Sequence, residues 1–493
     1  MKKRPNILYI FADQMRGDCL GVVNEQVQTP CLDRLASEGV TFTRCISNSP
    51  LCVPARAALM NGQLPRQSGV WSNRSGAHEE GPSHVRNIRD EGYRTAVIGK
   101  THLWRHGAAG QVGLHVAAME DRLKAWGFDD CLEINDPIET GWMDCHYTDH
   151  LAREGLLDAH RTFIMDWVRE AYRGNDPTPW NQSPAPVPEG EDIDAWVGRE
   201  AVRWLGQHDH SNPFYLQVQF TGPHDPYDGP EAYRDRYDAN TIDPGITEIP
   251  SGGSPIVRAR LAGSQAIIGA STEQRQQWRV NYYANITLID SWIGRILDQL
   301  SADNQLDNTW IIFTSDHGEM LGDHGLWSKA NFYNQSVHVP CIMRPARGHL
   351  AQEQGWQSRA LVQQIDVPVT ITDIAGASPL KNVEGRSLMP FAGYDSVDQV
   401  AHKGHECVLS ELFGQSTLIT DEYKLTVRVD DHKPAQLFDC ANDPDELRDD
   451  LLSEHATLAD SLTESYLRPL ADAINQDQLS DYRRYVRDTG QIN

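Results

Sequence analysis

Four stretches of the chain share one pattern, a short, mostly apolar run that is followed within a few residues by chemically reactive side chains. The runs, each with the polar residues that follow it, are 7–12 with Asp13 and Gln14, 95–98 with Lys100 and His102, 214–220 with His224, and 310–313 with Asp316 and His317. The run 7–12 is unbroken and apolar, which is typical of a strand buried on both faces of a parallel sheet, and the other three stretches repeat the strand pattern. Sites in open α/β sheets form outside the carboxyl ends of the strands, so we expect these polar side chains to lie together.

Helical patterns separate the apolar runs. Apolar residues recur at helical spacing between Tyr282 and Leu300 and predict a long helix before the fourth strand. A second helix is predicted over 366–375, with Gly376 just past its end, and a shorter one follows Thr29. Strands that alternate with helices predict an α/β fold.

The pattern changes beyond Pro390. Residues 416–420 and 424–429 predict a β-hairpin, and 435–438 predict a further strand. Leucines between 447 and 467 then predict helix. Neighbouring strands joined by short turns are antiparallel, so we expect a small antiparallel sheet with a helical tail.

These patterns predict two domains. We expect a catalytic domain over 1–392 and a smaller C-terminal α+β domain over 393–493, whose tail could pack on a neighbouring subunit and form a homo-oligomer. Two stretches rich in Pro, Gly and polar residues, 174–192 and 243–271, are predicted to be surface loops, with active-site lids as the alternative.

Composition excludes some partners. The formal net charge is −25, from 44 basic and 69 acidic residues without a basic block, which argues against nucleic acid. No apolar stretch is long enough to span a membrane. The nine cysteines are scattered without C-x-x-C pairs, which suits a reducing compartment. The basic start, Met1 to Arg4, precedes an apolar run without a small-residue cleavage site, so we expect a strand rather than a secretory signal, and a cytoplasmic protein.

The ends of the first and fourth runs offer two carboxylates, an amide oxygen and an imidazole. Such a set suits one divalent cation. Each group alone is as common in a cap or a turn, and only their convergence indicates a metal site. The candidate ligands at these two ends are Asp13, Gln14, Asp316 and His317.

Cys52 begins the pentapeptide CVPAR, which ends at Arg56. An irregular stretch gives way here to a short helical segment that ends near Gly62, so we expect Cys52 at a helix N-terminus, where unpaired N–H groups favour negative charge. An isolated cysteine is more often a buried structural residue. The reactive groups expected around Cys52 favour a nucleophile instead.

The pentapeptide resembles the C-x-P-x-R signature of the type I sulfatases, the formylglycine-dependent branch of the alkaline phosphatase superfamily. Motifs similar to those of this family recur in order along nearly the whole chain, at 5–14, 52–56, 99–103, 222–224, 315–329 and 437–447. The resemblance implies a large, mixed, mostly parallel sheet flanked by helices. It also implies hydrolysis of sulfate monoesters, with aryl sulfates as the expected substrates.

The family's cofactors follow from the same resemblance. Cys52 would be oxidised by a formylglycine-generating enzyme to formylglycine (3-oxoalanine), whose hydrate attacks sulfur. One divalent cation, Ca²⁺ or Mn²⁺, would bind next to it. The implied metal ligands are Asp13, Gln14, Cys52, Asp316 and His317.

The resemblance also assigns roles to the cationic side chains. Arg56 would steady the formylglycine, and Lys100 and Lys329 would bind the sulfate oxygens. His224 would protonate the leaving oxygen. His102 would then take the proton whose loss expels sulfate and restores the aldehyde.

Two positions depart from the commoner family pattern, which has Asp where Gln14 stands and Asn where His317 stands. The softer imidazole makes Mn²⁺ as plausible as Ca²⁺. The same pair resembles the phosphonate monoester hydrolases, relatives that also use formylglycine, and Asn73 matches a substrate-contacting Asn there. Those relatives carry Tyr and Thr in place of Lys100 and His102. The Lys and His favour sulfate monoesters, with phosphate diesters and phosphonates as side substrates.

The leaving group is less constrained. Trp71, Trp104 and Trp327 lie close in sequence to candidate site residues, which suits an aromatic group or the quaternary ammonium of choline sulfate, although core positions fit equally well. Two other classes stay open, a thiol enzyme with unmodified Cys52 and a non-catalytic binding protein. Tyrosine-phosphatase chemistry is disfavoured because it needs a longer spacing between cysteine and arginine than 52–56 provides.

Overall fold

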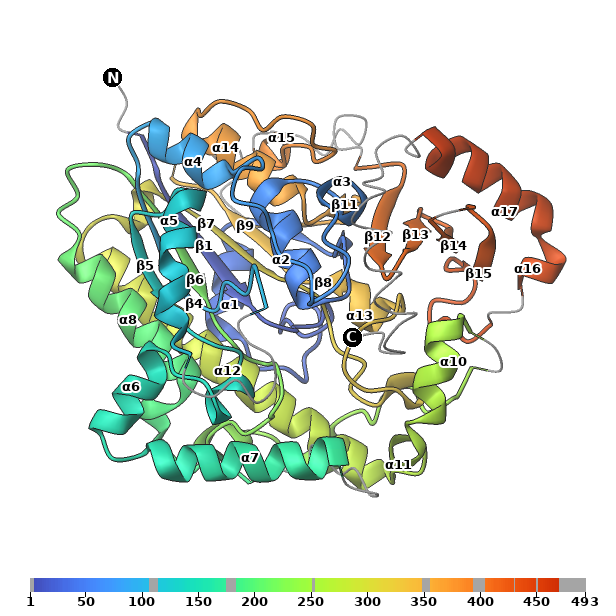
Figure 1. The fold of residues 1–493 in the computed structure, drawn as a ribbon, viewed down its shortest axis with the longest axis horizontal. Helices are drawn as coiled ribbons and strands as arrows, with labels where there is room; N and C mark the ends of the chain where they lie inside the picture. Colours follow the sequence, from blue (N-terminus) through green and yellow to red (C-terminus); the bar gives the residue numbers. More distant parts are fainter. Residues whose placement is uncertain are drawn as a thin grey trace.

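The computed structural model describes residues 4–105, 114–173, 183–250, 253–347, 355–392, 404–429, 431–448 and 451–469. An eight-stranded sheet with the order β10-β2-β9-β7-β1-β6-β4-β5 crosses the molecule (Figure 1). Its strands are β1 (Asn6–Ala12), β2 (Val40–Phe42), β4 (Arg94–Gly99), β5 (Asp130–Glu133), β6 (Phe214–Gln219), β7 (Thr309–Ser315), β9 (Cys341–Arg344) and β10 (Trp356–Ser358).

The middle of this sheet is parallel. β1 pairs in parallel with both β6 and β7, so that Ile10 lies opposite Val218 on one side and Phe313 on the other. β4 pairs in parallel with β5 and β6, whereas β9 is antiparallel to β7 and β2. The four predicted strands therefore end at one edge of the sheet, as expected, and the mixed α/β fold is confirmed.

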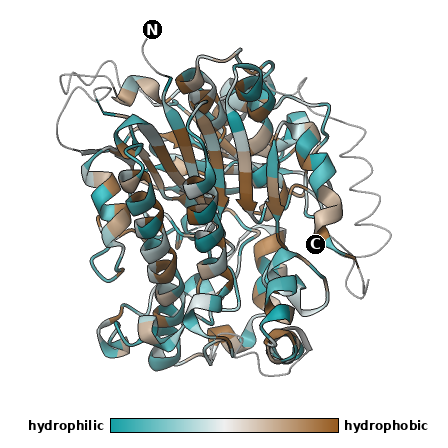
Figure 2. Ribbon diagram, turned by 90° about the vertical axis from the view of Figure 1, so that its left-hand side faces the viewer, coloured by the Kyte–Doolittle hydropathy of each residue, from teal (hydrophilic) through white to brown (hydrophobic). Residues whose placement is uncertain are grey.

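Helices cover both faces of the sheet. One face packs on α8 (Ile193–Gln207) and α12 (Thr272–Ala302). The other packs on α2 (Cys52–Asn61), α4 (His84–Asp90) and α14 (Asp366–Ala375). Side chains of a strand alternate between the faces, so both faces of the strands must be apolar, and Figure 2 shows hydrophobic strands between helices that are hydrophilic outside.

The predicted C-terminal sheet is also present. Its four strands are antiparallel in the order β12-β13-β14-β15, and β13 and β14 form the predicted hairpin. The elements of this region are β12 (Val408–Leu412), β13 (Gln415–Ile419), β14 (Tyr423–Arg428), β15 (Pro434–Asp439), α16 (Leu451–Glu454), α17 (Ala456–Leu462) and a π-helical turn over Thr463–Leu467. The predicted boundary at 392/393 borders residues outside the described ranges, so the division into two domains stays a prediction.

Shorter elements connect these layers. The helices are α1 (Pro30–Ser37), α3 (Pro65–Ser68), α5 (Glu120–Trp126), α6 (His146–Arg153), α7 (Leu157–Arg173), α9 (Glu231–Arg234), α13 (Asn334–Val337) and α15 (Met389–Ala392). A three-stranded sheet contains β3 (Cys45–Ile46), β8 (His338–Val339) and β11 (Val362–Gln363). None of the described helices has the length and apolar character needed to cross a membrane.

One loop prediction was wrong. The stretch 243–271 contains α10 (Pro255–Ala262) and α11 (Gln265–Ile268). Ser254 caps α10 by accepting a hydrogen bond from Val257 N, and Pro255 occupies its first turn, which is a helix-start signal independent of periodicity. Val257 is buried against Met320 and Leu326, so packing rather than an amphipathic repeat holds the helix. Of the other predicted loop, 174–192, residues 174–182 lie outside the described residues.

Candidate active site

The carboxyl edge of the main sheet brings together four of the candidate residues. Asp13 follows β1, Asp316 and His317 follow β7, and Cys52 is the first residue of α2. One potential ligand atom from each lies within 4.8 Å of all the others, and all four side chains are buried. Groups 265 residues apart in sequence are in direct contact here, since Cys52 Sγ lies 3.1 Å from His317 Nε2.

This group of four fits a divalent cation. Asp13 Oδ1 is buried without a hydrogen-bond partner, which is costly unless another positive group occupies the position. Two carboxylates and an imidazole within this distance are the donor set of a divalent metal. We therefore infer that the residues present suit the metal that the sequence predicts.

Gln14 lies beside this group, but its side chain is engaged elsewhere. Its backbone N–H donates to Asp316 Oδ1 over 2.9 Å, and its amide Nε2 donates to Glu319 Oε2 over 2.6 Å. Its amide oxygen accepts a hydrogen bond from Lys329. Metal ligation by Gln14 stays a prediction, because the oxygen that would serve as ligand is the one bonded to Lys329.

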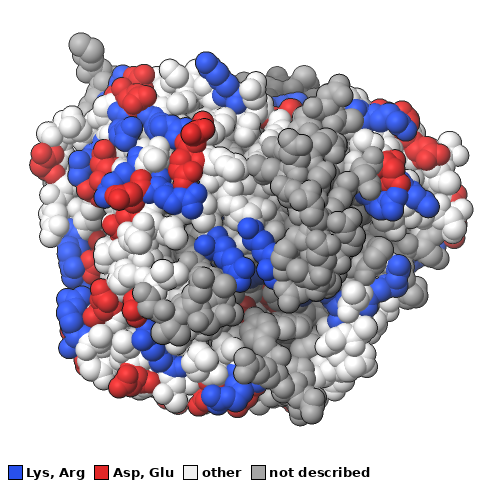
Figure 3. Space-filling view, in the orientation of Figure 1, with Lys and Arg blue, Asp and Glu red and all other residues white. Residues whose placement is uncertain are grey.

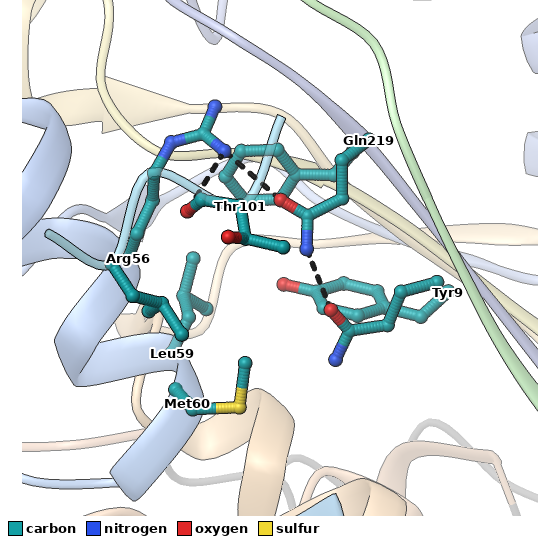
Figure 4. Close-up of a pocket in the computed structure, with 9 residues that line it drawn as sticks. Tyr9, Arg56, Leu59, Met60, Thr101 and Gln219 are labelled. Carbon is teal, nitrogen blue, oxygen red and sulfur yellow. Dashed lines mark hydrogen bonds between the residues drawn. The ribbon is translucent and has the colours of Figure 1, made fainter. Parts of the chain in front are cut away.

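Arg56 joins the two carboxylates. Its Nη2 donates to Asp13 Oδ2 and its Nε donates to Asp316 Oδ2, each over 2.9 Å. A small cavity of about 10 Å³, the size of one water, lies behind the guanidinium between Tyr9 and Thr101 (Figure 4). On this side Gln219 Oε1 accepts from Arg56 Nη1 over 2.9 Å. Arg56 is thus fixed from both sides and holds the two aspartates in place.

Lys100 and Lys329 are buried on either side of the group. Lys100 Nζ donates to Asp13 and to Asp136 Oδ2, the latter over 2.6 Å. Lys329 Nζ lies 2.6 Å from His224 Nε2. Burial by itself would lower the pKa of His224, but Asp136, 3.6 Å from its Nε2, raises that pKa to about 10.

The electrostatic environment favours an anion at residue 52. Burial by itself would raise the pKa of the Cys52 thiol, but the positive charges of Lys329, His317 and Lys100 outweigh it and hold that pKa well below its usual range. A low pKa of this kind means that the surrounding positive charges stabilise the thiolate. The same charges would stabilise oxyanions bound there. His102 adds a hydrogen bond that lowers the Cys52 pKa further.

Several residues around the site have left-handed backbone conformations, which are unfavourable for residues other than glycine. They are Gln14 (φ +66°), His102 (+45°), Ser328 (+59°) and Ala330 (+68°). Gly99, at the end of β4, has φ +112°, and a Cβ there would lie 1.9 Å from Gln219 O. Such strain persists where the surroundings hold it, and it clusters at functional sites.

A cavity of about 520 Å³ opens in front of these groups, within the usual size range of ligand pockets. Cys52, Asn73, His102, His224 and Lys329 all line it. Asn73 Oδ1 accepts a hydrogen bond from Val53 N at the start of α2, which ties the cavity wall to the residue after Cys52.

The predicted tryptophans do not line this cavity. Trp71 and Trp104 are buried in the protein core, and Trp327 packs at the edge of the core on the α12 side of the sheet. Trp142 lines the cavity instead.

Comparison with known proteins identifies the family. The sulfatase family model matches residues 5–377, and the model for the C-terminal region of N-sulphoglucosamine sulphohydrolase matches 322–468. The chain belongs to the sulfatase family. This sulfatase of the alkaline phosphatase superfamily is a sulfuric ester hydrolase, and membership implies a divalent metal and a formylglycine.

The relatives of this sulfatase agree over most of their length. It is 30% identical to an arylsulfatase of Clostridium perfringens, over 92% of this chain and 91% of that one. It is also 30% identical to a choline-sulfatase of Rhizobium meliloti, over 90% and 82%. Among solved structures, the phosphonate monoester hydrolase of Agrobacterium radiobacter superimposes with a TM-score of 0.75 over 96% of both chains at 24% identity, which shows a shared fold.

Some residues of the sulfatase site were not predicted from sequence. Asp136 pairs with Lys100 and faces His224, but it follows β5, a strand of four residues with an acidic residue at each end, which gave no apolar run. Glu319 accepts from Gln14, and it lies three residues after Asp316 within a recognised motif. Asp225 directly follows His224, so its position could have been noticed.

Proposed function

We propose that this sulfatase hydrolyses aryl sulfates with residue 52 as its nucleophile after conversion to formylglycine. The observation that carries the proposal is the contact of Cys52 with His317 inside the group that also contains Asp13 and Asp316. As a formylglycine hydrate, residue 52 would supply one hydroxyl to attack sulfur and a second whose deprotonation restores the aldehyde. A formylglycine-generating enzyme is the partner required for this conversion.

The proposed metal site consists of Asp13, Asp316, His317 and residue 52, with Gln14 beside them. A bound divalent cation would supply a Lewis acid for a sulfate oxygen and lower the pKa of the nucleophile. The imidazole makes Mn²⁺ as suitable as Ca²⁺ for this donor set. Elemental analysis of the purified protein, with reloading by each metal in turn, distinguishes the two.

The cationic side chains divide the remaining work. Lys100 and Lys329 would hold the sulfate oxygens as negative charge develops on them. His224 would protonate the leaving oxygen, since Asp136 keeps its pKa high enough for it to carry a proton at neutral pH. His102 would take the proton whose loss releases sulfate, and its hydrogen bond to residue 52 supports this role.

Lys100 distinguishes sulfatase from phosphonate hydrolase activity. The test is a comparison of kcat/KM for 4-nitrophenyl sulfate, phenylphosphonate monoester and bis(4-nitrophenyl) phosphate in the wild type and in Lys100→Ala. Removal of one oxyanion donor costs about 10²–10³-fold in rate, and we expect this loss on the sulfate ester and a smaller loss on the diester. Lys124→Ala, at an exposed lysine, is the control. Equal losses on both substrates would contradict the proposed preference for sulfate.

Three further parts of the proposal need their own tests. The scattered, unpaired cysteines support a cytoplasmic location, which fractionation of the producing cells tests. The domain boundary near 392/393 is tested by limited proteolysis. Oligomerisation through the C-terminal tail is tested by light scattering of the full chain and of a chain that ends at residue 469.

A further inference from the structure

Gln14 is an uncharged side chain that lies between buried charged groups. Figure 3 shows acidic and basic side chains interspersed over much of the face that it presents, where water and salt screen them. Glu319 and Asp225 lie in the interior instead, with 0% and 2% of their surface exposed. A carboxylate in such a place acts strongly on the groups that it contacts, because little solvent screens it. Both of these carboxylates contact the side-chain amide of Gln14.

The backbone of Gln14 is held at both of its polar groups. Its N–H donates to Asp316 Oδ1 over 2.9 Å, and its carbonyl oxygen accepts from the Tyr282 hydroxyl over 2.6 Å. These bonds hold the left-handed backbone conformation of Gln14, whose φ is +66°. The side chain therefore starts from a fixed point, and what remains to be set is the direction in which its amide faces.

The contacts of the amide select one orientation. Nε2 donates to Glu319 Oε2 over 2.6 Å and to Asp225 Oδ1 over 3.4 Å, while Oε1 accepts from Lys329 Nζ. In the flipped orientation the amide oxygen would face two carboxylates, and the NH2 group would face an ammonium group that has only donors. The Tyr227 hydroxyl is also hydrogen-bonded to Gln14, but a hydroxyl can donate or accept and so favours neither orientation.

This orientation matters because it determines where the ammonium group of Lys329 lies. Lys329 Nζ contacts Gln14 Oε1 on one side and His224 Nε2 on the other, the latter over 2.6 Å. Lys329 also lines the cavity in front of residue 52. A flipped amide would present N–H groups to this ammonium group and displace it.

We propose that Glu319 is a positioning residue: with Asp225 it sets the amide orientation of Gln14, and through Gln14 it sets the position of Lys329. The effect of Glu319 on turnover rests on the proposed function, in which Lys329 holds a sulfate oxygen. The same contacts favour an amide at position 14, where the commoner family pattern has Asp, because a carboxylate there would lie against two others.

Glu319 also has a structural role, which the test must separate from positioning. Its Oε1 accepts hydrogen bonds from the backbone N–H groups of Leu321 and Ser328. In Glu319→Gln the new amide oxygen can keep these bonds, but its NH2 group then faces the NH2 group of Gln14. Adding Gln14→Glu exchanges amide and carboxylate, so that position 319 donates to position 14 and the carboxylate at 14 still accepts from Lys329.

A double-mutant cycle measures this exchange. In each single variant kcat/KM for 4-nitrophenyl sulfate should fall at least about tenfold, the effect of one hydrogen bond to a charged group. In the exchange variant it should return to within about threefold of wild type, with the remaining deficit due to Asp225 Oδ1, which still faces position 14. Loss of the structural role alone would not be rescued by a change at residue 14. Single variants as active as wild type, or an exchange variant no more active than the singles, would overturn the proposal.

The urea midpoint of the full chain, with residue 52 left as cysteine, gives a second readout that needs no turnover. Each single variant should lower the midpoint, and the exchange variant should recover most of the loss. Glu411→Gln is the matched control, because it also replaces a buried glutamate, the partner of Arg66 in β12. Its loss should add to that of Gln14→Glu, since the two positions share no partner.

The two readouts separate this inference from the proposed function. A chain that hydrolyses no sulfate ester, but whose midpoint recovers in the exchange variant, refutes the proposed function and supports Glu319 as the residue that orients Gln14. An active chain whose exchange variant recovers neither quantity overturns the inference and leaves the proposed function standing. In an active chain, recovery of the midpoint without recovery of kcat/KM would overturn the link to Lys329.

Discussion

The carboxyl edge of the main sheet and the junction of α3 with the C-terminal sheet both bury charged side chains. At the junction Arg66 and Glu411 are fully buried and bond to each other, with Arg66 Nε 2.6 Å from Glu411 Oε1, and both bond to Ser416 Oγ. At the edge, Asp13 keeps one oxygen without a hydrogen bond, and Lys329 faces a cavity. Buried charge alone therefore does not mark a site; the site is the place where the charges are incompletely paired and open to a ligand.

The largest expected effect tests the structural side of this comparison. Glu411→Gln removes the carboxylate that pairs with the buried Arg66, which should lower the free energy of unfolding by about 3–5 kcal/mol. The catalytic rate of the folded protein should stay unchanged, because no described residue of the C-terminal sheet lines the cavity. Urea unfolding and an activity assay corrected for folded fraction provide the two measurements.

A double variant is the control for that experiment. Arg66→Met with Glu411→Leu removes both charges, and hydrophobic replacement of a buried ion pair is often neutral or stabilising. Stability should recover relative to Glu411→Gln. Loss of catalytic rate in the folded double variant would show that the junction contributes to the site directly.

The next effect tests the pairing at the edge. Asp136→Asn removes the charge that raises the pKa of His224, so His224 should lose its proton at lower pH. The alkaline limb of the kcat/KM profile should move down by about one to three pH units. Asp136→Glu retains the charge and should move the limb less. An alkaline limb that stays in place in Asp136→Asn would argue against His224 as the general acid.

The smallest effect concerns a third group of buried acids near α8. Burial raises the pKa of Asp194 to about 6 and that of Asp228 to about 7. The folded chain then binds more protons than the unfolded chain between about pH 4 and 7, so stability should fall as pH rises through this window. In Asp228→Asn, the fall in unfolding free energy across this pH window should be smaller by on the order of 1 kcal/mol. A slope of unfolding free energy identical to wild type would contradict this assignment.

The elements that carry the site could be predicted because burial on both faces leaves a strong signal. The runs before Asp13 and Asp316 are apolar throughout, and the chemistry follows at their ends. The sequence could not place Asp136, since β5 is short and only partly buried, and its pairing with Lys100 depends on the sheet order β6-β4-β5. Nor could the sequence show that Gln14 bonds to Lys329, a contact between residues 315 positions apart.

Packing also decides the positions that the sequence left open. Trp71 and Trp104 were compatible with either a ligand cavity or the core, and both are in the core. Trp142, which lines the cavity, lies far in sequence from every recognised motif. Arg74, Arg105 and Arg260, which also line the cavity, are likewise brought together by a bridge between Gly76 and Trp104 and by α10, neither of which a sequence period reveals.

The identity of residue 52 in active enzyme tests the account most directly. We predict that mass spectrometry of the peptide containing residue 52, from protein produced together with a formylglycine-generating enzyme, shows an aldehyde oxygen in place of the thiol. Across preparations, the apparent kcat should rise in proportion to the converted fraction. A preparation that hydrolyses aryl sulfate while residue 52 alkylates completely as cysteine would contradict the account.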